Sequence, residues 1–148
     1  MGASKWIDIH KYGKLKQDKR YTKECLQGLK QQGYRIVATT PHTNDVNLNE
    51  FNVDTPFALV FGTEYDGISD DVREEADEFL KIPMYGFTES FNISVSASLC
   101  MQHLSFKMRN ENIDFGLTVE EKEVLLLRWY EKIVKSSKQL KEQYLASL

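Results

Sequence analysis

The spacing of hydrophobic positions along the chain predicts alternating strands and helices. Short apolar runs bounded by turn-forming residues predict strands at residues 6–10, 34–39, 57–61 and 79–82. Apolar residues at helical spacing predict helices at residues 21–32, 70–77, 93–109 and 117–145. Because strands and helices alternate, the sequence predicts an α/β fold with a parallel sheet.

Capping residues mark the ends of two of these helices. Thr22 is placed to cap the first helix, and Gly33 to end it. Ser69 can cap the short acidic helix, with Asp70 and Asp71 at the positive end of its dipole. The last helix carries an apolar stripe, with Lys on its other side, made by Leu126, Tyr130, Ile133, Leu140 and Tyr144.

The candidate chemistry lies in two loops that follow predicted strands. One loop begins at residue 62 and the other at residue 83, and both are rich in Gly, Ser, Thr, Asn or Pro. Ligands of open α/β sheets bind outside the carboxyl ends of the strands. The two loops are therefore expected to build one pocket.

Each loop has a functional and a purely structural interpretation. Gly62 and Gly67 allow close backbone approach or positive φ, and Glu64 between them could orient a ribose hydroxyl, pair with an arginine, or be a solvated acid. In the second loop, exposed amides suit an adenine edge or a carboxylate, whereas Ser90 or Asn92 could simply cap the following helix. Neither loop has a GxGxxG or P-loop pattern, so phosphate-binding loops are not supported.

Composition fits one globular domain. The chain has 148 residues, of which 41% are hydrophobic and 28% charged. No membrane-spanning run or signal-peptide pattern is present, so we expect a cytoplasmic protein without a membrane partner. Cys25 and Cys100 lack CxxC spacing and predict reduced buried thiols, and His10, His42 and His103 lack metal-ligand spacing, so no metal is expected.

The charge is unevenly distributed. The net charge is -3, yet residues 1–35 carry nine Lys or Arg against three Asp or Glu. A basic face of this kind could contact a polyanion such as RNA, because phosphate contacts are electrostatic. It is also consistent with an ordinary solvated helix face, and composition alone favours this second interpretation.

The two loops carry motifs that resemble those of a known enzyme family. Phe61-Gly-Thr-Glu-Tyr-Asp-Gly-Ile-Ser69 is similar to the second motif of the SpoU/TrmH branch of the SPOUT RNA 2′-O-methyltransferases. Ile82-Pro-Met, with Glu89-Ser-Phe-Asn-Ile-Ser-Val-Ser-Ala97, is similar to the third. The resemblance covers nearly the whole chain. It departs where Phe91 replaces the usual Leu, which changes the volume of a pocket wall without removing a chemical group.

This resemblance implies a fold and an activity. The fold would be a SPOUT-type parallel sheet flanked by helices with a C-terminal deep trefoil knot, which is otherwise rare. Residues 1–109 would form the methyltransferase domain, incomplete at its N-terminus, and residues 110–148 a linker and an amphipathic helix. A homodimer would transfer a methyl group from S-adenosylmethionine to a ribose 2′-OH of RNA, in many members a tRNA guanosine, otherwise rRNA.

The resemblance also assigns site residues by position. Glu64, Ser90 and Asn92 would be catalytic, with Glu64 positioning an arginine and the other two holding that arginine or the ribose. The cofactor would bind largely through main-chain groups, at Thr39, Thr40, Gly62, Ile82, Met84 and Phe91.

One departure leaves other functions open. The family's first motif, which ends in the arginine thought to activate the ribose hydroxyl, belongs upstream of Gly2, and Arg20, Arg35 and Arg73 do not occupy a comparable setting. The chain is therefore expected to be a fragment or a truncated reading frame, or to be preceded by a further segment. An alternative is a non-catalytic module that binds S-adenosylmethionine or RNA, or that dimerises. A third hypothesis makes the helix at residues 118–145 a partner-binding element.

Overall fold

The structure, a computed structural model, describes residues 3–12, 20–41, 45–88 and 90–148, and the chain separates into two compact units. One unit comprises residues 11–114 and contains the sheet; the other combines residues 1–10 with residues 115–148. The predicted loop at residues 13–19 and His42 lie outside the described residues. No helix in the described part of the chain is long and apolar enough to cross a membrane.

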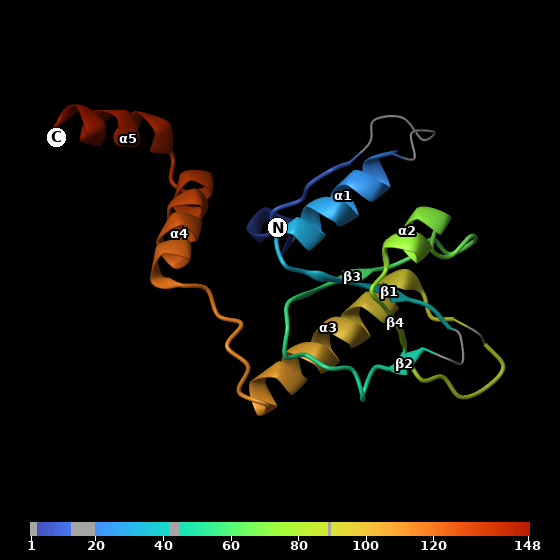
Figure 1. The fold of residues 1–148 in the computed structure, drawn as a ribbon. Coiled ribbons are helices and arrows are strands. Elements are labelled where there is room, and N and C mark those ends of the chain that lie inside the picture. Colours follow the sequence, from blue (N-terminus) through green and yellow to red (C-terminus); the bar gives the residue numbers. More distant parts are fainter. Residues whose placement is uncertain (1–2, 13–19, 42–44, 89) are drawn as a thin grey trace. The chain divides into compact units, whose positions relative to one another are not determined.

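A sheet of four parallel strands forms the centre of the larger unit (Figure 1). The strands are β1 (Arg35–Thr39), β2 (Val46–Asn47), β3 (Phe57–Val60) and β4 (Glu78–Lys81). Their order is β2-β4-β1-β3, so β1 lies between β4 and β3. The prediction of a parallel sheet is confirmed. The two-residue strand β2 was not predicted, because its pattern is too short to recognise.

Helices cover both faces of this sheet. The helices are α1 (Arg20–Gln31), α2 (Asp70–Glu75) and α3 (Ile93–Asn110). Alternate residues of β1 point to opposite faces. Val37 packs with Cys100 and Leu104 of α3, whereas Ile36 and Ala38 pack in a cluster with residues of α1 and α2. The sheet is therefore buried on both faces, as parallel sheets usually are.

Helix ends agree with the sequence in two cases and disagree in one. The Ser69 hydroxyl accepts a hydrogen bond from the Val72 N–H at 3.4 Å, which confirms the predicted cap of α2. Gly33 follows α1 with φ 87°, a conformation that favours glycine, so the predicted stop is also confirmed. The Thr22 cap is wrong, because α1 already begins at Arg20 and Thr22 lies inside its first turn.

In the smaller unit, the strand predicted at residues 6–10 is wrong. Residues Ala3–Trp6 form a short 3-10 helix, η1, and no strand follows it at residues 7–10. Ile7 and Ile9 are 59% and 60% exposed, so their alternation does not mark a buried strand face. The rings of Trp6 and of Trp129 on helix α4 (Val119–Ile133) instead pack edge to face, with their centroids 5.4 Å apart.

The long helix predicted at residues 117–145 is divided in two. Helix α4 ends at Ile133, and a second helix, α5, spans Ser137–Ala146. Ser136 between them has a positive φ of 61°, and the Ser137 hydroxyl donates to the Glu131 carbonyl at 2.9 Å. Serine side chains compete for backbone hydrogen bonds and so favour a break in a helix. The apolar spacing of the sequence continues across this break, which is why one long helix was predicted.

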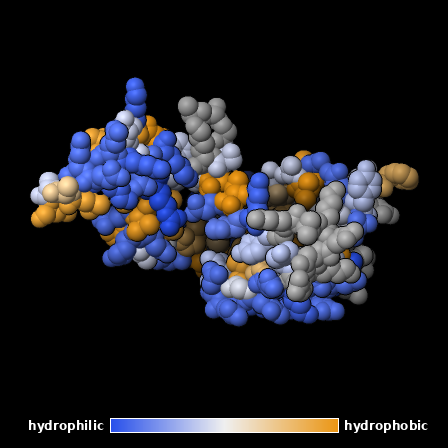
Figure 2. All heavy atoms as spheres, turned by 90° about the horizontal axis from the view of Figure 1, so that it is seen from above, coloured by the Kyte–Doolittle hydropathy of each residue, from blue (hydrophilic) through white to orange (hydrophobic). Residues whose placement is uncertain are grey.

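Figure 2 shows the surface of the molecule, on which hydrophobic side chains lie among hydrophilic ones.

Candidate active site

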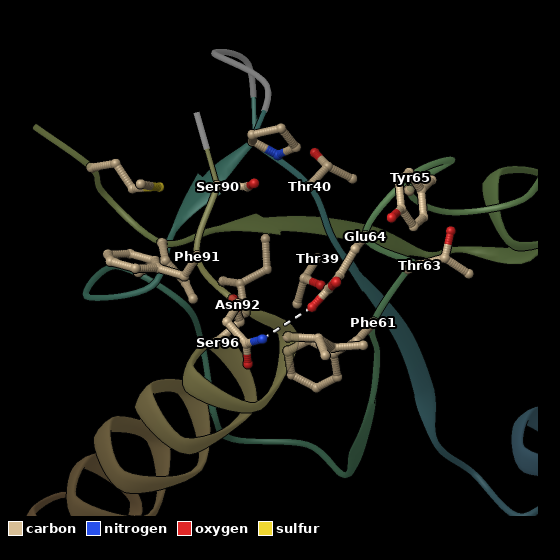
Figure 3. Close-up of a pocket in the computed structure, with 17 residues that line it drawn as sticks. Thr39, Thr40, Phe61, Thr63, Glu64, Tyr65, Ser90, Phe91, Asn92 and Ser96 are labelled. Atoms are coloured by element: carbon tan, nitrogen blue, oxygen red, sulfur yellow. Dashed lines mark hydrogen bonds between the residues drawn. The ribbon is translucent and has the colours of Figure 1, made fainter. Parts of the chain in front are cut away.

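A cavity of about 590 Å³ lies at the carboxyl ends of the strands. It is lined by the end of β1, the loop after β3, and the segment that joins β4 to α3 (Figure 3). All nine residues predicted for the site line it: Thr39, Thr40, Gly62, Glu64, Ile82, Met84, Ser90, Phe91 and Asn92. The structure therefore brings the two loops together around one space.

The end of β1 forms one wall and is held by both neighbouring strands. The Thr39 hydroxyl donates to the Val60 carbonyl of β3 at 3.1 Å. The Thr40 N–H donates to the Leu80 carbonyl of β4 at 2.9 Å, and the Thr40 hydroxyl donates to the Asp45 carboxylate. Thr40 is 8% exposed, and these hydrogen bonds connect the wall to both neighbouring strands.

The loop after β3 is a closed turn. The Thr63 N–H donates to the Gly67 carbonyl at 2.8 Å, and the Gly67 N–H donates back to Thr63 at 3.1 Å. The Thr63 hydroxyl also accepts from the Asp66 N–H at 3.0 Å. A Cβ on Gly62 would collide with the carbonyl group of Gly67, and Gly67 has φ 66°. Both glycines are therefore required by the turn.

Asn92 connects the two loops. Its side-chain Nδ2 donates to Glu64 Oε1 at 3.0 Å, as the dashed line in Figure 3 shows. Its Oδ1 accepts from the Ser94 N–H at 2.9 Å and caps α3. The sequence left a helix cap and a role at the site as alternatives for Asn92. The structure shows that one side chain caps the helix and contacts the predicted acid at the same time.

The remaining lining residues were not among the predicted site residues. They are Pro41, Phe61, Thr63, Tyr65, Gly67, Leu80, Ile93 and Ser96. Most of them are direct neighbours in the sequence of a predicted residue, so the motifs already marked their positions. Ser96 follows Asn92 by one helical turn, which the spacing of α3 could have revealed.

Arg35 does not line this cavity, because it is the first residue of β1 and the cavity lies at the carboxyl ends of the strands. Its guanidinium donates to Glu78 and to the Asn52 carbonyl, both at 2.8 Å, and lies over the Phe51 ring at 5.2 Å. These contacts give Arg35 a structural role. Within the described residues, no cluster of His, Cys, Asp and Glu could hold a metal ion.

Comparison with known families identifies the chain's relatives. A model of the SpoU rRNA Methylase family matches residues 1–102, which include both loops and the whole cavity. The chain belongs to this family. The resemblance in its motifs is thereby confirmed.

This SpoU family chain is similar to named tRNA-modifying enzymes. The tRNA (guanosine(18)-2'-O)-methyltransferase of Borreliella burgdorferi is 39% identical over 136 residues, covering 92% of this chain and 59% of the relative. The crystal structure of the Aquifex aeolicus TrmH/SpoU tRNA modifying enzyme has a TM-score of 0.64 and 31% identity, covering 76% of this chain and 58% of that one. The chain thus spans about three fifths of the length of these relatives.

A second solved structure supports the fold alone. The SpoU methyltransferase AviRb from Streptomyces viridochromogenes, solved in complex with AdoMet, has a TM-score of 0.53 at 21% identity. The matched region covers 63% of this chain and 37% of the AviRb chain. Its parallel sheet flanked by helices matches the sheet unit described above.

Proposed function

We propose that this SpoU family chain acts in S-adenosylmethionine-dependent methylation of a ribose 2′-OH in RNA. A guanosine of tRNA is the first candidate target, because the B. burgdorferi relative carries that activity in its name; rRNA is the second, after the name of the family. The observation that carries the proposal is the convergence of the nine predicted residues, seven of them from the two motifs, on one cavity at the carboxyl ends of the strands.

The cavity suits the proposed cofactor. Ile82, Met84 and Phe91 supply an apolar wall for the adenine ring, and Phe91 is 39% exposed, so its larger ring narrows the space without closing it. The turn at residues 62–67 also lines the cavity, and at Gly62 and Gly67 it places no side chain there. A bent ligand recognised largely through main-chain groups needs backbone that it can approach closely.

The sulfonium of S-adenosylmethionine supplies an electrophilic methyl group. The protein then needs to align the ribose oxygen with that methyl group and to assist removal of the hydroxyl proton. Glu64 is proposed to position an arginine for this purpose, because a carboxylate can accept from Asn92 and still accept a forked pair of hydrogen bonds from a guanidinium. Ser90, which lines the same cavity, is proposed to hold the arginine or the ribose.

Further parts of the proposal concern assembly, chain path and location. A homodimer is proposed, because α3 leaves large apolar side chains exposed at Val95, Leu99, Met101 and Phe106. A deep trefoil knot near the cofactor site is proposed from the family resemblance, as are a methyltransferase domain at residues 1–109 and an accessory segment at residues 110–148. The cytoplasm, where tRNA and rRNA are available, is the proposed location.

A methyl-transfer assay tests this function. The protein is incubated with tritiated S-adenosylmethionine and bulk tRNA, and the RNA is digested to nucleosides. We expect label in a 2′-O-methylated nucleoside, and we expect Glu64→Ala to reduce it at least about ten-fold, in line with the loss of a charge-assisted hydrogen bond. Absence of both cofactor binding and transfer would overturn the proposal.

The alternative of a non-catalytic module was raised because no arginine of the sequence matches the one that ends the family's first motif. The side chain of Arg35 is committed to a structural role away from the cavity. Calorimetry with S-adenosylmethionine, run beside the transfer assay, separates the two functions. Binding without transfer would favour a module that binds the cofactor, whereas transfer by this chain would exclude it.

A further inference from the structure

Three large aromatic side chains extend into solvent beside the proposed active site and contribute almost nothing to the core. Tyr65 is 95% exposed, Tyr85 is 97% exposed and Phe87 is fully exposed. Aromatic rings ordinarily bury a large area on folding, so full exposure of three in two short loops calls for a binding role. We call Tyr65, Tyr85 and Phe87 the aromatic rim.

The rim lies on both sides of the cavity. Tyr65 belongs to the loop after β3 and itself lines the cavity, as Figure 3 shows beside Glu64. Tyr85 directly follows Met84, another lining residue, in the loop after β4. In the sheet, β3 and β4 lie on opposite sides of β1. A molecule that enters above the end of β1 therefore passes between the two loops that carry the rings.

We propose that the aromatic rim stacks on unpaired nucleobases of the RNA and so delivers the target ribose to the cavity. This inference rests on the proposed function, and it adds the requirement that the target lies in an unpaired segment. A ribose inside a duplex is surrounded by paired and stacked neighbours, whereas the bases of loops and ends can be splayed out and stacked on aromatic side chains.

The residues around the rim favour nucleobases over a protein surface. Tyr65 stands between two acids in the sequence, Glu64 and Asp66, and Gly86 separates Tyr85 from Phe87. The core of a protein interface is depleted of charged residues, so a ring between two carboxylates fits it poorly. A stacked base needs only the face of one ring. The same carboxylates repel phosphates, so the rim is expected to contact bases and not the RNA backbone.

Binding of RNA to the full chain tests this proposal. Wild type is compared with Tyr65→Ala, with the double variant Tyr85→Ala/Phe87→Ala, and with Tyr85→Phe/Phe87→Tyr, which keeps both rings. Tyr34→Ala is the matched control, because Tyr34 is a 39% exposed aromatic just before β1, at the other edge of the sheet. The probes are bulk tRNA, a single-stranded RNA oligonucleotide and an RNA duplex.

We expect each lost ring to weaken binding of tRNA and of the single strand by about 5-fold to about 150-fold. The duplex, the ring-retaining variant and Tyr34→Ala should show no such loss. Because the rim contacts bases and not phosphates, the slope of affinity against salt should be unchanged. The affinity for S-adenosylmethionine, measured by calorimetry, should also be unchanged in Tyr85→Ala/Phe87→Ala, because neither of these two residues lines the cavity.

Several results would overturn the proposed role of the aromatic rim in stacking on nucleobases. If wild type bound tRNA and the alanine variants bound it equally well, this role would be wrong and the proposed function would remain in place. A flatter salt slope in those variants would indicate phosphate contacts, and a halved molecular mass would indicate a second copy of the chain as the occupant. If wild type neither bound nor methylated RNA, the proposed function would fail together with the rim.

Discussion

At the scale of single residues, Gly62 controls the shape of the cavity through a backbone contact. A Cβ at this position would meet the carbonyl carbon and oxygen of Gly67 and the N of Ile68, all of them backbone atoms that cannot rotate away. We expect Gly62→Ala to open the turn, to lower the free energy of unfolding by about 1–3 kcal/mol, and to weaken cofactor binding. Chemical denaturation and calorimetry measure the two effects.

Gly28 provides the matched control. It lies in the interior of α1, and a Cβ there would meet no atom within 4 Å. Since alanine is a better helix former than glycine, Gly28→Ala should raise the free energy of unfolding by about 0.5–1 kcal/mol. Equal effects of the two substitutions would contradict the assignment of a special backbone role to Gly62.

Asn92 allows its two roles to be separated. Asn92→Asp keeps an acceptor for the Ser94 N–H, and aspartate caps helices about as well as asparagine, so the cap of α3 should be retained. The substitution replaces the donor to Glu64 by a second carboxylate, and like charges at that distance repel. We expect methyl transfer to fall by at least about ten-fold while the unfolding transition is retained.

Asn92→Ala is the companion variant. It removes both contacts, so it should cost about 1 kcal/mol of stability in addition to the loss of transfer. If Asn92→Asp transferred methyl groups at the wild-type rate, the contact between Asn92 and Glu64 would be a by-product of helix capping.

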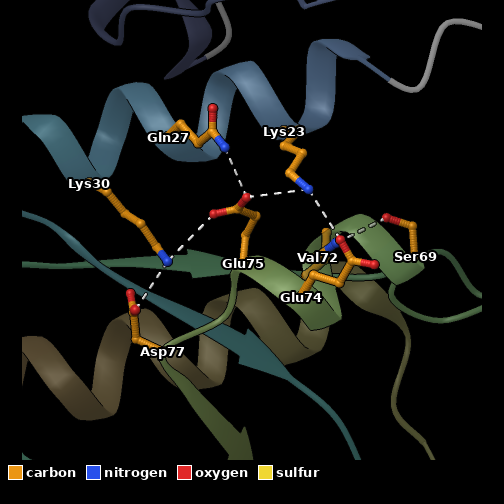
Figure 4. Close-up of polar contacts among 8 residues, drawn as sticks. All are labelled: Lys23, Gln27, Lys30, Ser69, Val72, Glu74, Glu75 and Asp77. Atoms are coloured by element: carbon orange, nitrogen blue, oxygen red, sulfur yellow. Dashed lines mark hydrogen bonds and ion pairs between the residues drawn. The ribbon is translucent and has the colours of Figure 1, made fainter.

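At the scale of elements, a polar network joins α1 to the end of α2 and to Asp77, which lies between α2 and β4 (Figure 4). Gln27 of α1 donates to Glu75 at 3.0 Å, and Lys30 lies 3.5 Å from Glu75 and 3.1 Å from Asp77. The Asp77 carboxylate accepts from the Ile36 N–H at 2.7 Å at the start of β1. Burial raises the pKa of Asp77, but the Ile36 N–H and Lys30 outweigh it and hold that pKa below its ordinary value.

This lowered pKa predicts a pH dependence. A carboxyl group with a depressed folded-state pKa contributes stability above its unfolded-state pKa of about 4, and that contribution is lost as the pH falls through the folded-state pKa. Asp77→Asn should therefore be less stable than wild type at pH 7, by less than about 1 kcal/mol because the Asp77 side chain is 41% exposed. The two denaturation curves should converge in acid. A difference that grew below pH 4 would contradict this origin.

The elements also show what the sequence could predict. Helix α3 was predicted to within one residue, because its apolar spacing and its Asn92 cap agree with the tertiary fold. The strand predicted at residues 6–10 failed because alternation indicates a strand only where a neighbouring strand pairs with it, and none does. The predicted residues of the cavity all line it, since two motifs and the parallel sheet fix their positions. The contact between Asn92 and Glu64 was not predicted, because it depends on side-chain rotamers.

At the scale of the whole molecule, the two units differ in how much they bury. Both hydrophobic core clusters and all cavity-lining residues lie within residues 11–114. No described side chain of the other unit is buried, and its cohesion includes the ring contact of Trp6 with Trp129 and an ion pair between Asp8 and Arg128 at 3.2 Å. Exposed ion pairs contribute little, so this unit should be the less stable of the two.

Tryptophan fluorescence can report the unfolding of the less buried unit separately from that of the sheet unit. It contains two tryptophans, Trp6 and Trp129, and both belong to the less buried unit. Tryptophan fluorescence should therefore follow that unit, whereas protection of Cys100, which is buried in the sheet core, follows the other. We expect the fluorescence transition in urea to precede the exposure of Cys100 to a thiol reagent, since separate units unfold separately.

A ligand of the cavity sharpens this prediction. A cofactor that binds only the folded sheet unit, at about one hundred times its dissociation constant, stabilises that unit by about 2.7 kcal/mol. We expect S-adenosylmethionine to move the exposure of Cys100 to higher urea while leaving the tryptophan transition in place. The control is Trp129→Phe, in which the remaining signal comes from Trp6 alone and the shift at Cys100 should be unchanged. If both transitions coincided and moved together with the cofactor, the two units would unfold as one cooperative body, and the ring contact between the tryptophans would be part of the stability of the site.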